Sequence, residues 1–293
     1  MSCPISGNEK EEGKQYGHSS LSYNSYLKVP ELKNLQICQS NPAHHDEPLF
    51  IVIHQTYELW FKLILHEIDE TMKLLADDRV KRATHFLRRV VAIMKVLVNQ
   101  IHILETMSPQ DFLGFRNNLN PASGFQSTQF RELEMACGLK DKQLLEHFKN
   151  DEIAYPELMK RYESHTLQDA YYAVLRKQGF DLPQPYDIDE SDPKSSERED
   201  KRIQSLRKLY EDSEKYADLN DLAEVLIDID EQISLWRVNH VTVVERVIGF
   251  KRGTGGSEGV GYLRSTLHKR CFPDLWKVRT VLEVPAISCG PTK

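Results

Sequence analysis

Two histidines lie on the apolar faces of long helical patterns. His54 falls within residues 48–77, where apolar side chains recur every three or four positions, and His240 follows Trp236 by one helical turn within residues 220–250. A neutral imidazole is a good iron ligand, so two inward imidazoles could bracket a flat iron cofactor such as haem. The common alternative is a core histidine bonded to a backbone carbonyl. Because the chain has 11 histidines, both interpretations stay open.

Arg116 and a glycine-rich run at residues 252–257 are the other candidates for chemistry. Arg116 follows two phenylalanines on a short helical pattern and could hold a carboxylate with two hydrogen bonds, although such an arginine more often reaches from an apolar face to solvent. The glycine-rich run resembles an anion nest to which Thr254 adds a hydroxyl, or equally a mobile lid. No P-loop, zinc-type histidine pair or Ser-His-Asp order is present.

Composition limits the class of protein. The 293 residues are 40% hydrophobic and 28% charged, which is ordinary for a soluble globular protein, and the net charge of -6 argues against nucleic-acid binding. The first twenty residues lack the apolar core of a secretory signal, and no eighteen-residue apolar run predicts a membrane span. Five scattered cysteines are typical of reduced thiols. We therefore expect a cytoplasmic protein without a membrane segment.

The periodicity predicts an all-α chain. Two short helices separated by a break at Pro30 are expected in residues 21–40, and residues 181–200 read as an exposed acidic loop. We expect residues 1–20 to be disordered, 21–280 to form one helical domain and 281–293 to be a tail. The main helices are predicted at 48–77, 80–107, 109–119, 126–137, several short stretches of 139–178, a stretch from 197, 220–250 and 273–280.

Several segments together resemble the tryptophan 2,3-dioxygenase family. They are YNSYLK (23–28), HDEPLFIVIHQTYELWFK (45–62), LETMSPQDFLGFRNNLNPASGFQSTQFRELE (104–134), LWRVNHVTVVERVIG (235–249) and GTGGSEGVGYLRST (253–266). They follow one another in order along the chain, and the three longest are highly specific.

The resemblance implies an all-helical bundle that encloses a b-type haem and assembles as a homotetramer. It implies insertion of both atoms of O2 across the indole C2–C3 bond of L-tryptophan, which gives N-formyl-L-kynurenine in the first step of tryptophan catabolism by the kynurenine route. In the family pattern, His240 of WRVNH is the axial ligand of the haem iron. His54 of FIVIHQ is the catalytic histidine near the indole N–H, with Phe50 and Ile51 in the pocket wall.

The resemblance also implies how the amino-acid part of the substrate is held. Arg116 pairs the carboxylate, Thr254 binds the amino-acid group as its loop closes, and Ser123 lies at the haem edge. Phe112 stands where some members have a tyrosine, so we expect it to pack without a polar contact. Three residues of a neighbouring subunit would complete the pocket: Tyr23, Tyr26 and Leu27.

Two other classes of protein remain possible from the residues alone. One is a non-catalytic haem sensor in which both histidines ligate the iron, and the other is a helical scaffold without a cofactor. Arg116 and the GTGGS loop favour the enzyme, because a sensor needs no anchor for an amino acid.

Overall fold

The computed structural model describes residues 21–186, 191–255 and 259–283. Regular structure within these ranges is helical, without a strand, so the all-α prediction is confirmed. The chain divides into two units, Met1–Ile37 and Cys38–Lys293. The segment predicted to be disordered, 1–20, and positions 284–293 of the predicted tail lie outside the described residues.

Thirteen α-helices and three 3-10 helices are found in the described residues. The α-helices are α1 (Tyr23–Leu27), α2 (Val29–Leu32), α3 (Glu47–Ala76), α4 (Val80–Gln100), α5 (Pro109–Arg116), α6 (Thr128–Cys137), α7 (Lys142–Phe148), α8 (Ala154–Glu163), α9 (Leu167–Lys177), α10 (Ser195–Glu211), α11 (Ala217–Ile248), α12 (Val260–Ser265) and α13 (Pro273–Val281). The 3-10 helices are η1 (Ile101–Thr106), η2 (Asn117–Leu119) and η3 (Gly124–Gln126).

Helix α3 begins where the sequence predicts it. Asp46 occupies the N-cap position, Glu47 lies in the first turn and Pro48 lies in the first two helical positions, where its missing N–H costs nothing. The predicted stripe is buried along most of its length, from Ile53 to Leu75. Burial of this stripe holds the helix against its neighbours, because propensity alone does not stabilise a helix in water.

The second predicted helix ends earlier than its apolar pattern. Helix α4 stops at Gln100, and the stripe continues through the 3-10 helix η1 up to Thr106. The prediction of one α-helix over 80–107 is therefore wrong in its last two turns, since apolar residues three apart fit either helix type. Val96 follows the apolar spacing of this pattern, but it is 47% exposed.

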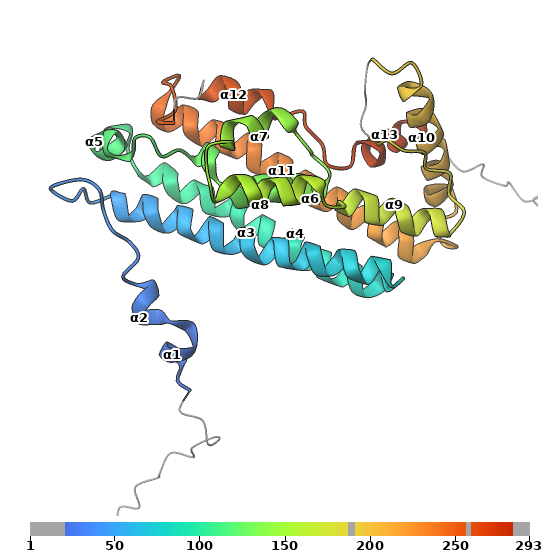
Figure 1. The fold of residues 1–293 in the computed structure, drawn as a ribbon, viewed down its shortest axis with the longest axis horizontal. Helices are drawn as coiled ribbons and strands as arrows, with labels where there is room; N and C mark the ends of the chain where they lie inside the picture. The colour runs from blue at the N-terminus through green and yellow to red at the C-terminus, as the bar shows by residue number, and fades with distance from the viewer. Residues whose placement is uncertain (1–20, 187–190, 256–258, 284–293) are drawn as a thin grey trace, which may run out of the picture. The chain divides into compact units, whose positions relative to one another are not determined.

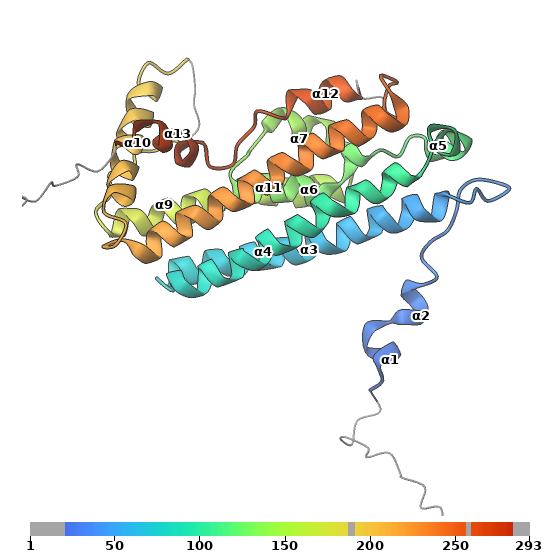
Figure 2. The same ribbon diagram turned by 180° about the vertical axis from the view of Figure 1, so that it is seen from behind.

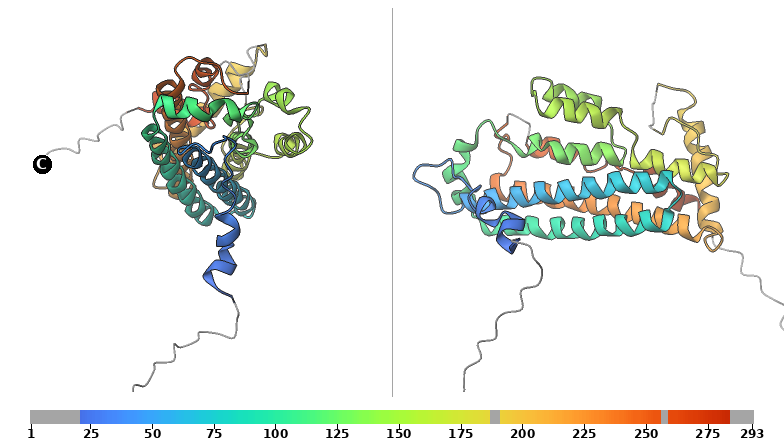
Figure 3. Two further views of the ribbon diagram at one scale, coloured as in Figure 1. Left: turned by 90° about the vertical axis from the view of Figure 1, so that its left-hand side faces the viewer. Right: turned by 60° about the horizontal axis from the view of Figure 1, so that its bottom comes forward.

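The three long helices α3, α4 and α11 form the body of the second unit. Helix α4 packs against both α3 and α11, and Figures 1 and 2 show the three lying lengthwise beside one another. Helices α6 and α9 pack on α3, while α8 packs on α6, as the right-hand view of Figure 3 shows for the green and yellow segments. This packing encloses a hydrophobic core that runs along the three long helices.

The N-terminal unit has two short helices, as predicted, but the break between them is not at Pro30. Lys28 adopts a left-handed backbone conformation with φ of 53° and ends α1, whereas Pro30 lies in the first turn of α2. A proline is tolerated there because the first N–H groups of a helix have no intrahelical acceptor.

The described parts of the acidic segment, 181–186 and 191–200, differ from the exposed loop predicted there, and residues 187–190 lie outside the described residues. Leu182 and Tyr186 are only 2% and 7% exposed, and helix α10 begins at Ser195. The buried Arg202 of α10 donates to the backbone carbonyls of Pro183, Pro185 and Tyr186. One guanidinium thus supplies hydrogen-bond donors to three backbone carbonyls, in a stretch whose composition alone predicts a loop in solvent.

No single helix of the described residues is long and apolar enough to cross a membrane. One pair of helical segments, Val80–Thr106 and Pro109–Leu119, bent by 89°, meets the criterion by length and composition only.

Candidate functional site

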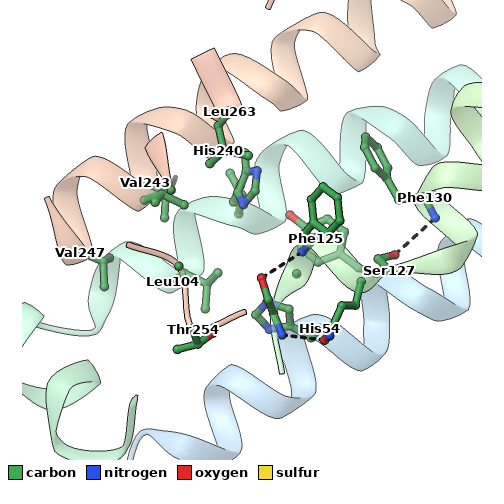
Figure 4. A pocket seen from close by; sticks show the side chains of 18 of the residues that line it. His54, Leu104, Phe125, Ser127, Phe130, His240, Val243, Val247, Thr254 and Leu263 are labelled. Carbon is green, nitrogen blue, oxygen red and sulfur yellow. Dashed lines mark hydrogen bonds between the residues drawn. The ribbon is translucent and has the colours of Figure 1, made fainter. Parts of the chain in front are cut away.

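A largely apolar cavity of about 560 Å³ lies among α3, α5, α6, α11 and the loops that join them. Its volume is typical of cofactor and ligand sites, which are roughly 300–1,000 Å³. His54 projects from α3 and His240 from α11 toward the same space, with Leu104 and Phe125 beside them (Figure 4). The apolar part of the lining is Phe50, Tyr57, Phe61, Ile101, Leu104, Met107, Phe112, Leu119, Phe125, Phe130, Trp236, Val243, Val244, Val247, Ile248 and Leu263.

His54 has one ring nitrogen committed to the backbone. Its Nδ1 lies 2.7 Å from the carbonyl oxygen of Phe50, and since a carbonyl only accepts, Nδ1 carries the hydrogen. Burial lowers the pKa of His54, against the opposing effects of the Phe50 carbonyl and Glu58. The neutral ring therefore presents Nε2 as a hydrogen-bond acceptor.

Aromatic rings surround His54 at one end of the cavity. The Phe50 ring centroid lies 4.1 Å from that of His54 and 5.5 Å from that of Phe112. Phe112 meets Phe115 edge-to-face at 5.3 Å, and Met107 completes this small cluster. Ring pairs in such geometries hold one another in fixed orientations, so this wall is rigid.

His240 is held by ring stacking. Trp236, one turn earlier on α11, stacks on it with centroids 4.9 Å apart and an interplanar angle of 28°. Burial, aided by the nearby His54 and Arg131, lowers the pKa of His240 to about 4. The imidazole is therefore neutral near pH 7, which is the form that ligates iron.

Three buried charged side chains line the cavity behind His240. They are Arg131 and Glu134 of α6 and Arg237 of α11, which is three residues before His240 and so on the same side of its helix. Arg131 Nη1 donates to Glu134 Oε2 at 2.7 Å, and Arg237 Nη2 donates to Glu134 Oε1 at 2.6 Å. We refer to these three residues as the α6–α11 charge network.

Two loops close the other end of the cavity and are bonded to each other. Arg116, in the last turn of α5, donates from Nη2 to the carbonyl oxygen of Arg252. Thr254 Oγ1 donates to the carbonyl oxygen of Ala122 at 2.5 Å. Both side chains line the cavity, and each bonds a backbone group of the opposite loop. A ligand carboxylate or ammonium could replace these bonds.

The structure brings most of the predicted site residues to this cavity. Those that line it are Phe50, His54, Phe112, Arg116, Ser123, His240 and Thr254. Ile51 is adjacent to Phe50 on α3 but does not line the cavity, because a helix turns the next residue about 100° away. Phe112 contributes packing, as expected, through the Phe50 and Phe115 rings.

The three residues predicted to reach a neighbouring subunit lie in α1. Tyr23, Tyr26 and Leu27 are 75%, 69% and 43% exposed. Their place in the pocket of another subunit stays a prediction.

Sequence reasoning missed four charged residues of the cavity: Glu58, Arg131, Glu134 and Arg237. The carboxylate of Glu58 accepts from Ser127 at 2.6 Å and from Gln129 at 2.8 Å. A usable signal existed for Arg237, because a charge three residues from His240 falls on the predicted inner face. No pattern in the sequence distinguishes Glu58, Arg131 and Glu134 from the charged residues that usually lie in solvent.

The cavity fits the haem expected from the sequence. No group of three or more His, Cys, Asp and Glu side chains that could hold a metal occurs in the described ranges. A haem iron takes most of its ligands from the porphyrin, so a single protein ligand is sufficient for it. His240 supplies one neutral imidazole, and no hydrogen bond of the described chain holds its ring nitrogens. Aromatic and aliphatic side chains supply surfaces for a flat apolar macrocycle.

Comparisons with known proteins show the family of the chain. The model of the family described as "Tryptophan 2,3-dioxygenase" matches residues 8–187 and 188–282. The chain is 40% identical over 264 residues to tryptophan 2,3-dioxygenase of Myxococcus xanthus, which covers 90% of this chain and 90% of the relative. It is 44% identical over 267 residues to the enzyme of that name from Herpetosiphon aurantiacus, and the match covers 90% of this chain and 99% of the relative. It is 45% identical over 277 residues to the tryptophan 2,3-dioxygenase of a Nocardioides species, and the match covers 93% of this chain and 97% of the relative.

Proposed function

This chain belongs to the tryptophan 2,3-dioxygenase family, and on that premise we propose that it inserts both atoms of O2 across the C2–C3 bond of the indole of L-tryptophan. The product is N-formyl-L-kynurenine, and enzymes of this family depend on haem. The observation that carries the proposal for the site is that His54 and His240, from different helices, line one largely apolar cavity.

His240 is the residue that would hold the haem iron. Its ring is neutral near pH 7 and is kept in orientation by Trp236. When bound, the haem supplies the iron centre that binds and activates O2. The aromatic and aliphatic lining excludes water from the reacting groups.

His54 would orient the indole. Because Nδ1–H is bonded to the Phe50 carbonyl, Nε2 is available to accept a hydrogen bond from the indole N–H. Its lowered pKa makes it a weak base, and an indole N–H is a very weak acid. A hydrogen bond that fixes the ring is sufficient, so we assign His54 a role in orientation rather than proton removal.

Arg116 and Thr254 would hold the two charged groups of the amino acid. The Arg116 guanidinium matches a carboxylate with two parallel N–H donors. The Thr254 hydroxyl can accept from the ammonium, and Ser123 lies beside it at the cavity edge. Phe50 and Phe112 would pack against the indole without a polar contact. Anchoring of both ends places C2 and C3 in one position, which is how binding energy contributes to rate.

The assembly and the cellular compartment are further parts of the proposal. We propose a homotetramer in which Tyr23, Tyr26 and Leu27 complete a neighbour's pocket, supported by the resemblance and by the exposure of these apolar side chains. We also propose that the protein works in the cytoplasm, for which the scattered cysteines are the support.

The test is a visible spectrum of the ferrous protein, recorded before and after addition of L-tryptophan and air. We expect a Soret band, a spectral change on addition of tryptophan, and a product that contains both atoms of isotopically labelled O2. Incorporation of one labelled atom, or a ferrous spectrum typical of two histidine ligands that tryptophan does not alter, would refute the proposal.

A substitution tests the iron ligand separately. We expect His240→Ala to lose stable haem binding, because no other imidazole lines this part of the cavity except His54. Circular dichroism of the variant confirms that the helices persist. A full Soret band and unchanged turnover in His240→Ala would show that another residue is the ligand.

A further inference from the structure

The α6–α11 charge network is buried and has no role in the proposed reaction so far. Arg131, Glu134 and Arg237 are 7%, 7% and 3% exposed. Beyond its bond to Glu134, Arg237 donates from Nη1 to the Lys269 carbonyl at 2.9 Å, which ties α11 to the chain before α13. Buried charges cost free energy unless paired, so this arrangement calls for a physical explanation.

The network carries one uncompensated positive charge. Two guanidinium groups face one carboxylate. Burial acts to raise the pKa of Glu134, but the charges and hydrogen bonds of Arg131 and Arg237 outweigh it and hold that pKa below its ordinary value. All three groups are therefore ionised near pH 7. The Nε atoms of both arginines are buried and find no acceptor in the described ranges, so no second carboxylate neutralises the charge at these two N–H groups.

This positive charge acts on the place where iron would be bound. Arg131 and Arg237 line the same cavity as His240, and Arg237 precedes His240 by three residues on α11. The lining of this cavity is largely apolar, so the charge is weakly screened. Phe125 and Phe130 cover the Arg131 guanidinium at 5.1 and 5.4 Å from their centroids.

We propose that the α6–α11 charge network sets the reduction potential of the bound iron in favour of the ferrous form. Ferric iron carries one positive charge more than ferrous iron, so a buried positive charge nearby disfavours the ferric form. O2 binds ferrous haem, and the network thus keeps the enzyme in the state that the proposed reaction needs. This inference rests on the proposed function, because it assumes haem held by His240. Arg131, Glu134 and Arg237 are positioning residues, since they need not touch the substrate.

The experiment measures the ferric/ferrous potential of the intact haem-loaded enzyme by spectroelectrochemical titration. Glu134→Gln removes the negative charge and Arg131→Gln removes a positive one, so we expect shifts of opposite sign. At a fixed poise the ferrous-to-ferric ratio should rise about tenfold in the first variant and fall about tenfold in the second, or about 59 mV each for one electron. This size corresponds to a unit charge acting over roughly 12 Å at an effective dielectric constant of about 20.

Two control variants accompany the pair. Arg131→Lys keeps the charge, so its potential should stay near that of the wild type. Arg161→Gln removes an arginine that is also bonded to carboxylates, those of Asp69 and Glu132, but does not line the cavity. Its potential should be unchanged.

The signs of the shifts in potential distinguish an electrostatic effect of the substituted charge from structural disturbance of the cavity. Water entering a disturbed cavity would move the potentials of Glu134→Gln and Arg131→Gln in the same direction, which would overturn the proposal, as would the absence of a shift in both. If Glu134→Gln fails to retain haem, the comparison of Arg131→Gln with Arg131→Lys decides: equal potentials overturn the proposal. Failure of the proposed function is seen independently, because the His240→Ala variant would then keep the Soret band of the wild type.

Discussion

Replacement of Arg116 by alanine tests how the substrate is recognised. In the structure the Arg116 guanidinium donates to the Arg252 carbonyl, so a substrate carboxylate has to replace that bond. Two charge-assisted hydrogen bonds to a carboxylate contribute about 3 kcal/mol in a partly buried site, and the bond to the neutral carbonyl that is given up contributes about 1 kcal/mol.

The difference predicts a loss of about 2 kcal/mol in transition-state binding of tryptophan by Arg116→Ala. That loss corresponds to about a 30-fold decrease in kcat/KM. Arg116→Lys keeps the charge but not the fork of two donors, so we expect an intermediate decrease. The haem spectrum should be unchanged in both variants.

The assay compares L-tryptophan with tryptamine, which lacks the carboxylate. Wild-type enzyme should prefer tryptophan by about the same 30-fold, since tryptamine cannot make the pair. In Arg116→Ala the two compounds should be handled almost equally, because neither finds the guanidinium. This comparison is a double-mutant cycle in which one partner is the substrate.

An unchanged preference for tryptophan in Arg116→Ala would refute the assignment. If that unchanged preference came with equal losses for both compounds, Arg116 would act by holding residue 252 and its loop in place.

Three further outcomes are expected. His54→Ser should lower turnover yet leave appreciable activity; complete loss, with haem content and tryptophan binding unchanged, would speak against a purely orienting role. Gly255→Ala should raise KM for tryptophan, because a Cβ there would lie 2.7 Å from the Ser123 Cβ, and an unchanged KM would show that the two loops separate freely. Glu47 accepts from the backbone N–H groups of Gln39 and Ser40 at 2.6 and 3.0 Å, so Glu47→Gln should lower the free energy of unfolding at pH 7 by about 1–3 kcal/mol in denaturant titrations. Burial acts to raise the pKa of Glu47, but the Ser40 hydroxyl and these N–H groups hold it below 4.5; wild type should therefore lose this stabilisation as the pH falls below 4.5 and converge on the variant, and a constant difference down to pH 3 would contradict the assignment.

The long helices could be predicted because each buries one face over many turns. In α3 and α11 the apolar residues recur with the helical period, so both the bounds and the inward direction of His54 and His240 follow from the sequence. Helix α12 was not predicted, because the glycines at 259 and 261 have a low helix propensity and give no helix-start signal.

Charged residues mark the limit of this reasoning. Arg202 is fully buried because carbonyls of Pro183 and Pro185 and the carboxylate of Asp274, distant in sequence, converge on it. A local pattern carries no information on such partners, so the burial of Arg202 could not be predicted from the sequence. The α6–α11 charge network could not be predicted for the same reason, because Glu134 and Arg237 are distant in sequence.

That two imidazoles share one cavity is likewise a consequence of packing and not of either helix alone. Each stripe predicts an inward histidine, but the two faces are fixed relative to each other by tertiary contacts, such as those of α4 with both α3 and α11 and that of Tyr57 with Trp236. Arg116 and Thr254 depend on tertiary structure even more, because each is held by the opposite loop. From the sequence alone these two residues could be assigned only through the resemblance of whole segments. The scaffold is therefore specified by periodicity, whereas the recognition of the amino acid is specified by loops whose conformations are set by one another.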